Sequence, residues 1–492
     1  MRKLKLFLLI ILFFVSELTV SLNKNHNEQL IFKSRIVNWK VYNCNNYKKI
    51  ILDTHVFIKI GPDTISNPRI ISPFIKIKKS DKFIRIKLKS VGYINAIIIV
   101  NEKNEKIAWF NLLAKISYMK PLELNYVINK KKLINSKYIK IIISGFDKNF
   151  HDNNSYFAVG DIRVYSFNKL EKPLIDTTFI GNIGINYISY NSDTRYTWLT
   201  DKFDFDKVKR DIKVIKQLGN SVRIWCTADN LSEFDSLGNW KGFTNNINNL
   251  DSIFSLFSNE NIKIIPTIFS QKSWSGLELS EKIIKDSLIA KSYINLCYNF
   301  VKAFEKYNAI IGWDICNESM NTTLCGHLKG KERMFAYEKA RDFMCNIYSK
   351  IKSITSKPVI ATFGNLFVSW SLIDPKEFCD IIGYSAYLDT KNDSLVFFET
   401  NNSMDFIDYQ YSCQKPYFIS ELGAPIDRLN NNNSYRNPVV NMEYLSKFFN
   451  QFSINDLNMI LLWRDKDVLW DRKNYNLNTD FKLIKKLKIK AN

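Results

Sequence analysis

The chain has 492 residues, hydrophobic residues make up 46% of it, and its formal net charge is +22. This length suffices for about two or three domains with sizeable cores, and the ordinary apolar and aromatic content excludes a wholly disordered chain. The glycine and cysteine counts exclude collagen-like and small disulfide-stapled classes. The only long apolar run lies at the N-terminus, which excludes a polytopic membrane protein.

The positive charge comes mostly from lysine, since only 14 of the 70 basic residues are arginine. Isoleucine and asparagine are also abundant, a bias typical of AT-rich coding sequence, and arginine is the better reader of phosphate groups. We therefore expect a solvated basic surface and no nucleic-acid partner. A surface that binds polyanions is an alternative that rests on charge alone.

The first 21 residues have the pattern of a cleaved secretory signal. Arg2, Lys3 and Lys5 form a positive region, residues 6–15 are continuously apolar, and small residues follow at 19–21. About ten apolar residues are too few to span a bilayer. We therefore expect a protein that is secreted, or held in the lumen of the secretory pathway, with no stable membrane insertion. An uncleaved signal anchor is the alternative.

Eight cysteines in a secreted chain could form up to four disulfides, and their spacing leaves the pairing open. No Cys-x-x-Cys occurs, and the four histidines are far apart in the sequence. We therefore expect no structural zinc site. No sequence pattern indicates the oligomeric state.

Residues 25–168 contain short β-type runs separated by polar turns, with no long amphipathic helix between them. This rhythm predicts an all-β domain, an antiparallel sandwich or jelly roll. The last run is similar to the closing strand of galactose-binding-like carbohydrate-binding domains, which makes glycan binding a hypothesis for this domain. The clearest runs are residues 82–88, 96–100, 138–143 and 161–167.

A polar linker around residues 168–176 leads into a different rhythm, in which β-rich runs alternate with helical ones. Eight such alternations in about 320 residues predict a (β/α)8 TIM barrel over residues 177–492. A doubly wound sheet is the alternative, but no glycine-rich phosphate loop follows the first strand. The predicted strands are residues 183–190, 221–227, 262–270, 310–318, 358–363, 380–387, 417–421 and 459–464, and the predicted helices are residues 205–218, 247–260, 281–306, 332–354, 441–452 and 481–489.

Two glutamates end two of these strands. Glu318 ends the fourth, directly after Asn317, and Glu421 ends the seventh. Because the active site of such a barrel lies at the C-terminal ends of the strands, both carboxylates are expected at one mouth. Cleaving a glycosidic bond with retention needs one carboxyl as acid/base and a second as nucleophile, about 5–5.5 Å apart. We therefore predict Glu318 as the acid/base and Glu421 as the nucleophile, with no metal or organic cofactor.

At these residues the chain resembles the clan A glycoside hydrolases. Trp-x-x-x-Asn-Glu at the fourth strand and Ser-Glu-x-Gly at the seventh are similar to the two catalytic signatures of that clan. Family 5, which contains endo-mannanases and endo-glucanases, is the branch that residues 179–492 resemble most. The resemblance implies that Arg223 holds the nucleophile and that Asn317 hydrogen-bonds the sugar 2-hydroxyl. It also implies that Tyr387 lies near the nucleophile and that Trp463 stacks under the sugar in the −1 subsite.

The chain departs from the usual family 5 pattern at three positions. Ser385 stands where a histidine usually precedes the x-Tyr pair, Ser319 stands where a proline usually follows the acid/base, and no histidine ends the third strand. A divergent branch, or a neighbouring clan A family, is therefore an alternative to family 5.

Several aromatic residues have two readings, as sugar subsites or as core. In the barrel these residues are Trp225, Trp274 and Trp370, and we predict that Trp274 binds substrate. In the N-terminal domain they are Trp39, Tyr93 and Trp109, which we expect in the core. Asp314 is expected to support the fourth strand from behind.

The sequence thus predicts a retaining glycoside hydrolase that acts on a β-linked polysaccharide or oligosaccharide. The resemblance implies a β-1,4-mannan or β-glucan as the substrate. The alternative is a catalytically inactive barrel that serves as a secreted carbohydrate-binding or adhesion protein. The joint presence of Glu318, Glu421 and Arg223 argues against that alternative, because an inactive barrel is free to lose any of them.

Overall fold

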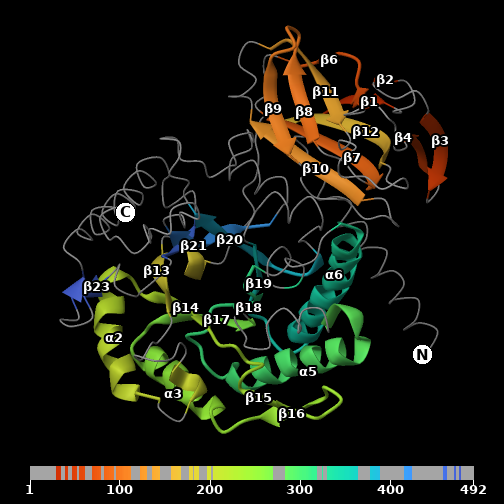
Figure 1. The fold of residues 1–492 in the computed structure, drawn as a ribbon. Helices are drawn as coiled ribbons and strands as arrows, with labels where there is room; N and C mark the ends of the chain where they lie inside the picture. The colour runs from red at the N-terminus through yellow and green to blue at the C-terminus, as the bar shows by residue number, and fades with distance from the viewer. Residues whose placement is uncertain are drawn as a thin grey trace, which may run out of the picture.

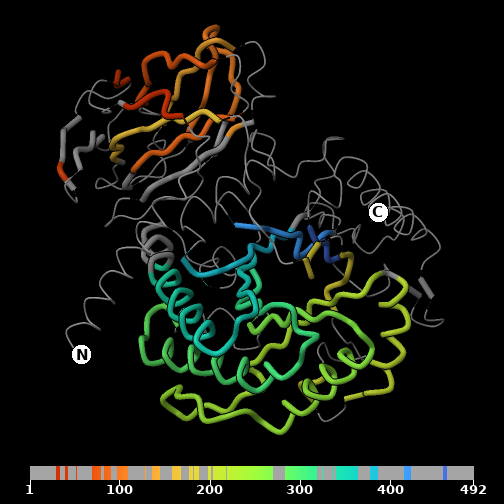
Figure 2. Tube along the Cα trace, turned by 180° about the vertical axis from the view of Figure 1, so that it is seen from behind, coloured from red at the N-terminus to blue at the C-terminus, as the bar shows by residue number. Residues whose placement is uncertain are grey.

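In the computed structural model the chain forms an N-terminal all-β unit and a C-terminal α/β barrel. Figure 1 shows the first in red to orange and the second in yellow to blue, and the reverse view in Figure 2 shows the same two groups of elements. The structure describes residues 29–34, 39–42, 47–52, 55–60, 69–78, 83–92, 96–111, 122–129, 136–144, 157–167, 177–180, 182–187, 197–200, 203–269, 283–318, 324, 330–363, 377–387, 415–423, 458–462, 470–471 and 476–477.

Two antiparallel six-stranded sheets make up the N-terminal unit (Figure 1). One has the order β10-β7-β12-β4-β3 with β1 beside β12, and the other has the order β2-β5-β11-β8-β9 with β6 beside β11. The predicted all-β sandwich is confirmed. Its strands are β1 (Gln29–Ser34), β2 (Lys40–Tyr42), β3 (Tyr47–Leu52), β4 (His55–Ile60), β5 (Arg69–Ile71), β6 (Ile75–Lys76), β7 (Phe83–Gly92), β8 (Ala96–Asn101), β9 (Lys106–Asn111), β10 (Leu122–Asn129), β11 (Tyr138–Ser144) and β12 (Phe157–Phe167).

Isoleucine dominates the core of this sandwich. Along β11, Ile139, Ile141 and Ile143 are buried and alternate with more exposed side chains. Such alternation is what an antiparallel strand with one buried face requires. Trp39 is also buried, as expected. Tyr93 and the side chain of Trp109 lie outside the described residues.

Eight parallel strands close into a barrel, in chain order, with β13 paired to β22. This confirms the predicted TIM barrel and excludes the doubly wound sheet, which has no such closure. Every predicted strand overlaps an observed one. The strands are β13 (Asn182–Tyr187), β14 (Ser221–Trp225), β17 (Lys263–Phe269), β18 (Trp313–Cys316), β19 (Val359–Phe363), β20 (Ile381–Tyr387), β21 (Tyr417–Gly423) and β22 (Met459–Leu462).

Helices lie outside the barrel strands (Figure 1). They are α2 (Phe205–Leu218), α3 (Ile247–Asn259), α5 (Ser287–Phe304) and α6 (Gly330–Lys352), and each overlaps a predicted helix. The side chain of Asp204 accepts the Lys207 amide at 2.9 Å, which caps α2 at its N-terminus. The predicted helices at 441–452 and 481–489 lie outside the described residues.

Short elements that the sequence did not predict complete the described part of the barrel. A hairpin of β15 (Ser232–Phe234) and β16 (Trp240–Phe243) follows β14, and β23 (Trp470–Asp471) pairs with β24 (Asn476–Leu477). Two 3₁₀ turns, η4 (Thr177–Phe179) and η5 (Thr197–Leu199), flank β13. The described helices include none that is long and apolar enough to cross a membrane.

Five of the eight cysteines lie among the described residues, and none of the five is in a disulfide. The other three lie outside the described residues, so their pairing remains open. Burial raises the pKa of the Cys226 and Cys297 thiols well above its ordinary value, so both remain protonated in the core. The five are Cys226, Cys297, Cys316, Cys345 and Cys379.

Candidate active site

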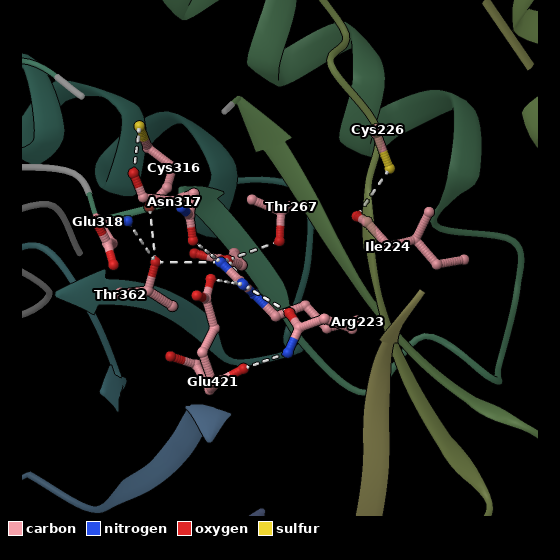
Figure 3. A network of polar contacts seen from close by, with 12 residues as sticks. Arg223, Ile224, Cys226, Thr267, Cys316, Asn317, Glu318, Thr362 and Glu421 are labelled. Carbon is pink, nitrogen blue, oxygen red and sulfur yellow. Dashed lines mark hydrogen bonds and ion pairs between the residues drawn. The ribbon is translucent and has the colours of Figure 1, made fainter. Parts of the chain in front are cut away.

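Three barrel strands bring four of the predicted residues to one mouth. Arg223 is the third residue of β14 and Glu421 is the fifth residue of β21. Asn317 and Glu318 follow directly after β18. Figure 3 shows these side chains gathered in one network of polar contacts.

The guanidinium of Arg223 is completely buried and binds two carboxylates. Its Nε and Nη2 atoms donate to Oδ2 of Asp314 at 2.9 and 2.6 Å, and Nη1 donates to Oε1 of Glu421 at 2.9 Å. Nη1 also donates to Oδ1 of Asn186 at 2.9 Å, and Nη2 to Oδ1 of Asn317 at 2.6 Å. This single side chain therefore ties β14 to β13, β18 and β21.

The two carboxyl groups beside Arg223 affect its pKa. Burial lowers the pKa of Arg223, but the charges of Asp314 and Glu421 raise it by more, so the pKa lies above its ordinary value and the residue stays cationic. Arg223 thus lies between the carboxyl groups of Asp314 and Glu421. Because removing ions from water is costly, a buried cluster of this kind is weak evidence for a stabilising role. Charged groups gathered in a barrel mouth are typical of a functional site.

The two glutamates have different surroundings. Glu421 is buried, with its side chain 2% exposed, and the adjacent guanidinium favours its ionised form. Glu318 is only partly buried, and its backbone has a φ of +44°, in the left-handed region that residues other than glycine rarely adopt. Its amide nitrogen donates to Oγ1 of Thr362 in β19 at 3.0 Å.

The sequence analysis missed three residues of the network and misplaced a fourth. Asp314 was expected behind its strand, but this was wrong, because it faces the barrel interior, where its Oδ2 accepts from Arg223 and from Oγ1 of Thr267 at 2.8 Å. All four side chains are completely buried. The signal that would have found them is a polar residue inside an otherwise apolar strand. They are Asn186, Thr267, Asp314 and Thr362.

The remaining predicted residues are placed only in part. Tyr387 is the last residue of β20, but its side chain lies outside the described residues, as do Trp274, Trp370 and Trp463. Trp225 is 4% exposed and its ring centroid lies 5.7 Å from the guanidinium carbon of Arg223, so it packs as core beside the network. Among the described residues, no group of three or more His, Cys, Asp or Glu side chains is arranged to hold a metal.

No family profile and no curated protein matches this chain. Among solved structures, it is similar to the CBM22-1–GH10 modules of endo-1,4-beta-D-xylanase 10B from Clostridium thermocellum, at 9% identity and a TM-score of 0.39, over 89% of this chain and 90% of that one. A family 5 xyloglucanase from Paenibacillus pabuli matches at 13% identity and a TM-score of 0.43, over 64% and 99%.

A beta-1,4-D-mannanase from Cryptopygus antarcticus matches at 15% identity and a TM-score of 0.39, over 58% of this chain and 82% of that one. Similarities of this strength do not place the chain in a family. The function therefore has to be inferred from the residues at the mouth of the barrel.

Proposed function

We propose that this chain is a retaining glycoside hydrolase that cleaves a β-linked polysaccharide or oligosaccharide by double displacement. The observation that carries the proposal is the buried contact between Arg223 and Glu421, in the same network that holds Glu318. A nucleophile has to be ionised, and Glu421 lies against a cation. An acid/base has to take a proton from the attacking water in the second step, and Glu318 is the more exposed of the two carboxyls.

The reaction follows from these roles. In the first step the Glu318 carboxyl gives its proton to the glycosidic oxygen while a Glu421 oxygen attacks the anomeric carbon. The C–O bond to the leaving sugar breaks, and a glycosyl ester of Glu421 forms. In the second step Glu318, now a carboxylate, removes a proton from water, which attacks the anomeric carbon and releases Glu421. Both residues end in their starting protonation states.

The charge of the site supports the same assignment. Positive charge develops on the sugar ring in the oxocarbenium-like transition state, and two carboxyl side chains, those of Asp314 and Glu421, lie in the cluster around Arg223. Such a site favours the transition state over a neutral sugar. Since Oδ1 of Asn317 accepts from Arg223, the amide plane is fixed with Nδ2 as the donor, as a contact with the sugar 2-hydroxyl requires.

The substrate and the outer subsites are finer parts of the proposal. The resemblance to family 5 supports endo action on a β-1,4-mannan or β-glucan. Trp463 is proposed as the platform under the −1 sugar, Tyr387 as a contact near the nucleophile, and Trp274 as a further subsite. The N-terminal pattern supports secretion, which N-terminal sequencing of the mature protein would test by finding a start soon after Ser21.

The first experiment is an assay of reducing ends released from β-mannan, β-glucan, xylan and galactan by the full chain. We expect release from one polymer, and its loss in Glu421→Ala. Glu260→Ala is the matched control, because Glu260 is an exposed glutamate paired with Lys216 outside the barrel, and we expect it to behave as the wild type.

Activity that survives in Glu421→Ala would refute the mechanism. If the wild type releases no reducing ends from any of the polymers, and its circular dichroism spectrum is that of a folded protein, hydrolysis of these substrates would be contradicted. A glycan array would then show whether the barrel only binds sugar.

A further inference from the structure

We propose that Thr362 is a positioning residue that fixes the acid/base Glu318 for proton transfer. The inference rests on the proposed function and adds to it a residue that no sequence pattern indicated. Thr362 lies in β19, which carries neither of the two candidate catalytic carboxyls. Its hydroxyl nevertheless lies beside the backbone from which Glu318 projects (Figure 3).

The backbone at Glu318 needs an external support. A φ of +44° places the residue in the left-handed region, where the Cβ of an L-residue is crowded by its own backbone. A residue stays in that region when its surroundings hold it there, and such residues gather at functional sites. The direction in which the Glu318 carboxyl leaves the end of β18 therefore depends on what holds residues 316–318.

Thr362 holds this segment from both sides. Its Oγ1 donates to the carbonyl oxygen of Cys316 at 2.9 Å and accepts from the amide of Glu318 at 3.0 Å. The Asn317 amide also donates, to the carbonyl oxygen of Phe269 at 3.0 Å. One hydroxyl thus bonds to the backbone on both sides of Asn317, at Cys316 and at Glu318.

The place of Thr362 is shaped by its neighbours. The side chain is completely buried, and Gly383 on the adjacent strand β20 makes room for it, because a Cβ at Gly383 would lie 2.5 Å from the Thr362 methyl group. The hydroxyl also accepts from Nη2 of Arg223 at 3.3 Å. Thr362 therefore joins the backbone of Glu318 to the guanidinium that holds Glu421.

This arrangement predicts a loss that depends on the leaving group. An aglycone that is a poor leaving group needs the proton of Glu318 during C–O cleavage, whereas 2,4-dinitrophenolate leaves without it. Removing the hydroxyl of Thr362 should misplace the proton donor. The nucleophile should stay in position, because Arg223 keeps its shorter bonds to Asp314, Asn186 and Glu421. We therefore expect kcat/KM to fall for substrates with a poor leaving group, because kcat/KM reports the steps up to and including cleavage of the glycosidic bond.

The experiment compares three variants on two β-glycosides of the sugar that the wild type cleaves, one with a methyl and one with a 2,4-dinitrophenyl aglycone. Thr362→Val removes the hydroxyl at nearly constant volume, and Thr362→Ser keeps it. Thr355→Val is the matched control. The Thr355 hydroxyl also accepts a backbone amide, from Lys357 at 3.0 Å, and donates to a second group, Oε1 of Glu305 at 2.8 Å, but it precedes β19 at the opposite end of the barrel.

We expect Thr362→Val to lower kcat/KM about 30- to 100-fold on the methyl glycoside and less than about threefold on the dinitrophenyl glycoside. Thr362→Ser should stay within about threefold of the wild type on both, and Thr355→Val should leave both values unchanged. If Thr362→Val does not fold, Thr362→Ala removes the same hydroxyl with a smaller side chain and is read in the same way.

An equal loss on both substrates, or no loss on either, overturns the positioning role while the hydrolase assignment stands. The comparison with Glu318→Ala separates the two ideas, since that variant should show the leaving-group dependence whether or not Thr362 contributes. A wild type that cleaves neither these glycosides nor any of the polymers overturns both.

Discussion

The two ends of the barrel carry polar networks of opposite character. At the C-terminal mouth, Arg223 pairs with both Asp314 and Glu421, and the three side chains are at most 2% exposed. At the N-terminal end, Lys357 pairs with Glu305 and Lys352 pairs with Asp380, with side chains 18–30% exposed and charges that balance. The pairs at the N-terminal end, which we call the floor of the barrel, are typical of contacts that support a fold. The buried charges at the mouth are costly to desolvate, which is typical of a functional site.

The floor also shows what an ordinary structural network does. Thr355 and Trp313 donate to the Glu305 carboxylate, and Nζ of Lys357 donates to the carbonyl oxygens of Glu305 and Tyr307, each at 3.0 Å. These bonds satisfy chain ends between a helix and the next strand. At the mouth, by contrast, the groups that accept from Arg223 include side chains that project into the barrel from four other strands, β13, β18, β19 and β21. The difference predicts that substitutions at the two ends will affect different properties.

The largest expected effect is on turnover at the mouth. Glu421→Ala and Glu318→Ala should each lower kcat by at least about 10³-fold, because each removes a group that the mechanism needs in both steps. Steady-state kinetics on the polymer that the wild type cleaves would measure this. The double variant should be little slower than either single one, since the two residues act as a unit; fully multiplicative losses would contradict the shared mechanism.

The second effect is on stability. Arg223→Met takes from two buried carboxylates the cation that pairs with both, so we expect the free energy of unfolding to fall by about 3–5 kcal/mol. Lys357→Met at the floor removes a partly exposed cation and should cost about 1 kcal/mol. Urea denaturation followed by tryptophan fluorescence would measure both. Equal losses of unfolding free energy in the two variants would contradict the difference that we infer between the mouth and the floor.

The third and smallest effect is a pH dependence at the floor. Burial raises the pKa of Asp380, but the hydrogen bonds from the Val359 amide and Tyr348 and the charge of Lys352 together lower it by more. The pKa of Asp380 therefore lies below its ordinary value. With a folded pKa below the unfolded one, the unfolded chain binds more protons. The stabilisation is therefore present above the unfolded pKa and is lost as the pH falls through the folded one.

Asp380→Asn should accordingly destabilise the protein by about 1 kcal/mol near pH 7. The difference in the free energy of unfolding between variant and wild type should shrink as the pH falls below about 4. Denaturation curves at several pH values give this difference directly. A difference that stays constant with pH would show that the Asp380 charge contributes nothing, while kcat should be unaffected throughout.

The order of the strands and helices in the barrel can be predicted from the sequence more fully than the set of side chains that meet inside its mouth. The eight strands are recognisable because each is a β-rich apolar run before or after a helical segment, and Glu318 and Glu421 stand out as carboxylates that end such runs. What the sequence does not show is which strand residues share a layer in the closed barrel. For that reason Asp314 was placed on the wrong side of its strand.

The same limit applies to local conformation. The left-handed backbone at Glu318 has no signal in the sequence, since glutamate is not a residue that favours it. The role of Thr362 depends on the pairing of β19 with β18 and β20 and on the small residue Gly383, which only the closed barrel brings together. The roles of Tyr387, Trp274 and Trp463 remain predictions.

The measurement that tests the central claim most directly is proton NMR of the first sugar released during hydrolysis of a β-linked substrate. A double displacement through a glycosyl ester of Glu421 predicts that the first product is the β-anomer, which then mutarotates. The α-anomer as the first product would show a single displacement by water. That result would contradict a nucleophilic role for the carboxylate that Arg223 holds in the mouth of the barrel.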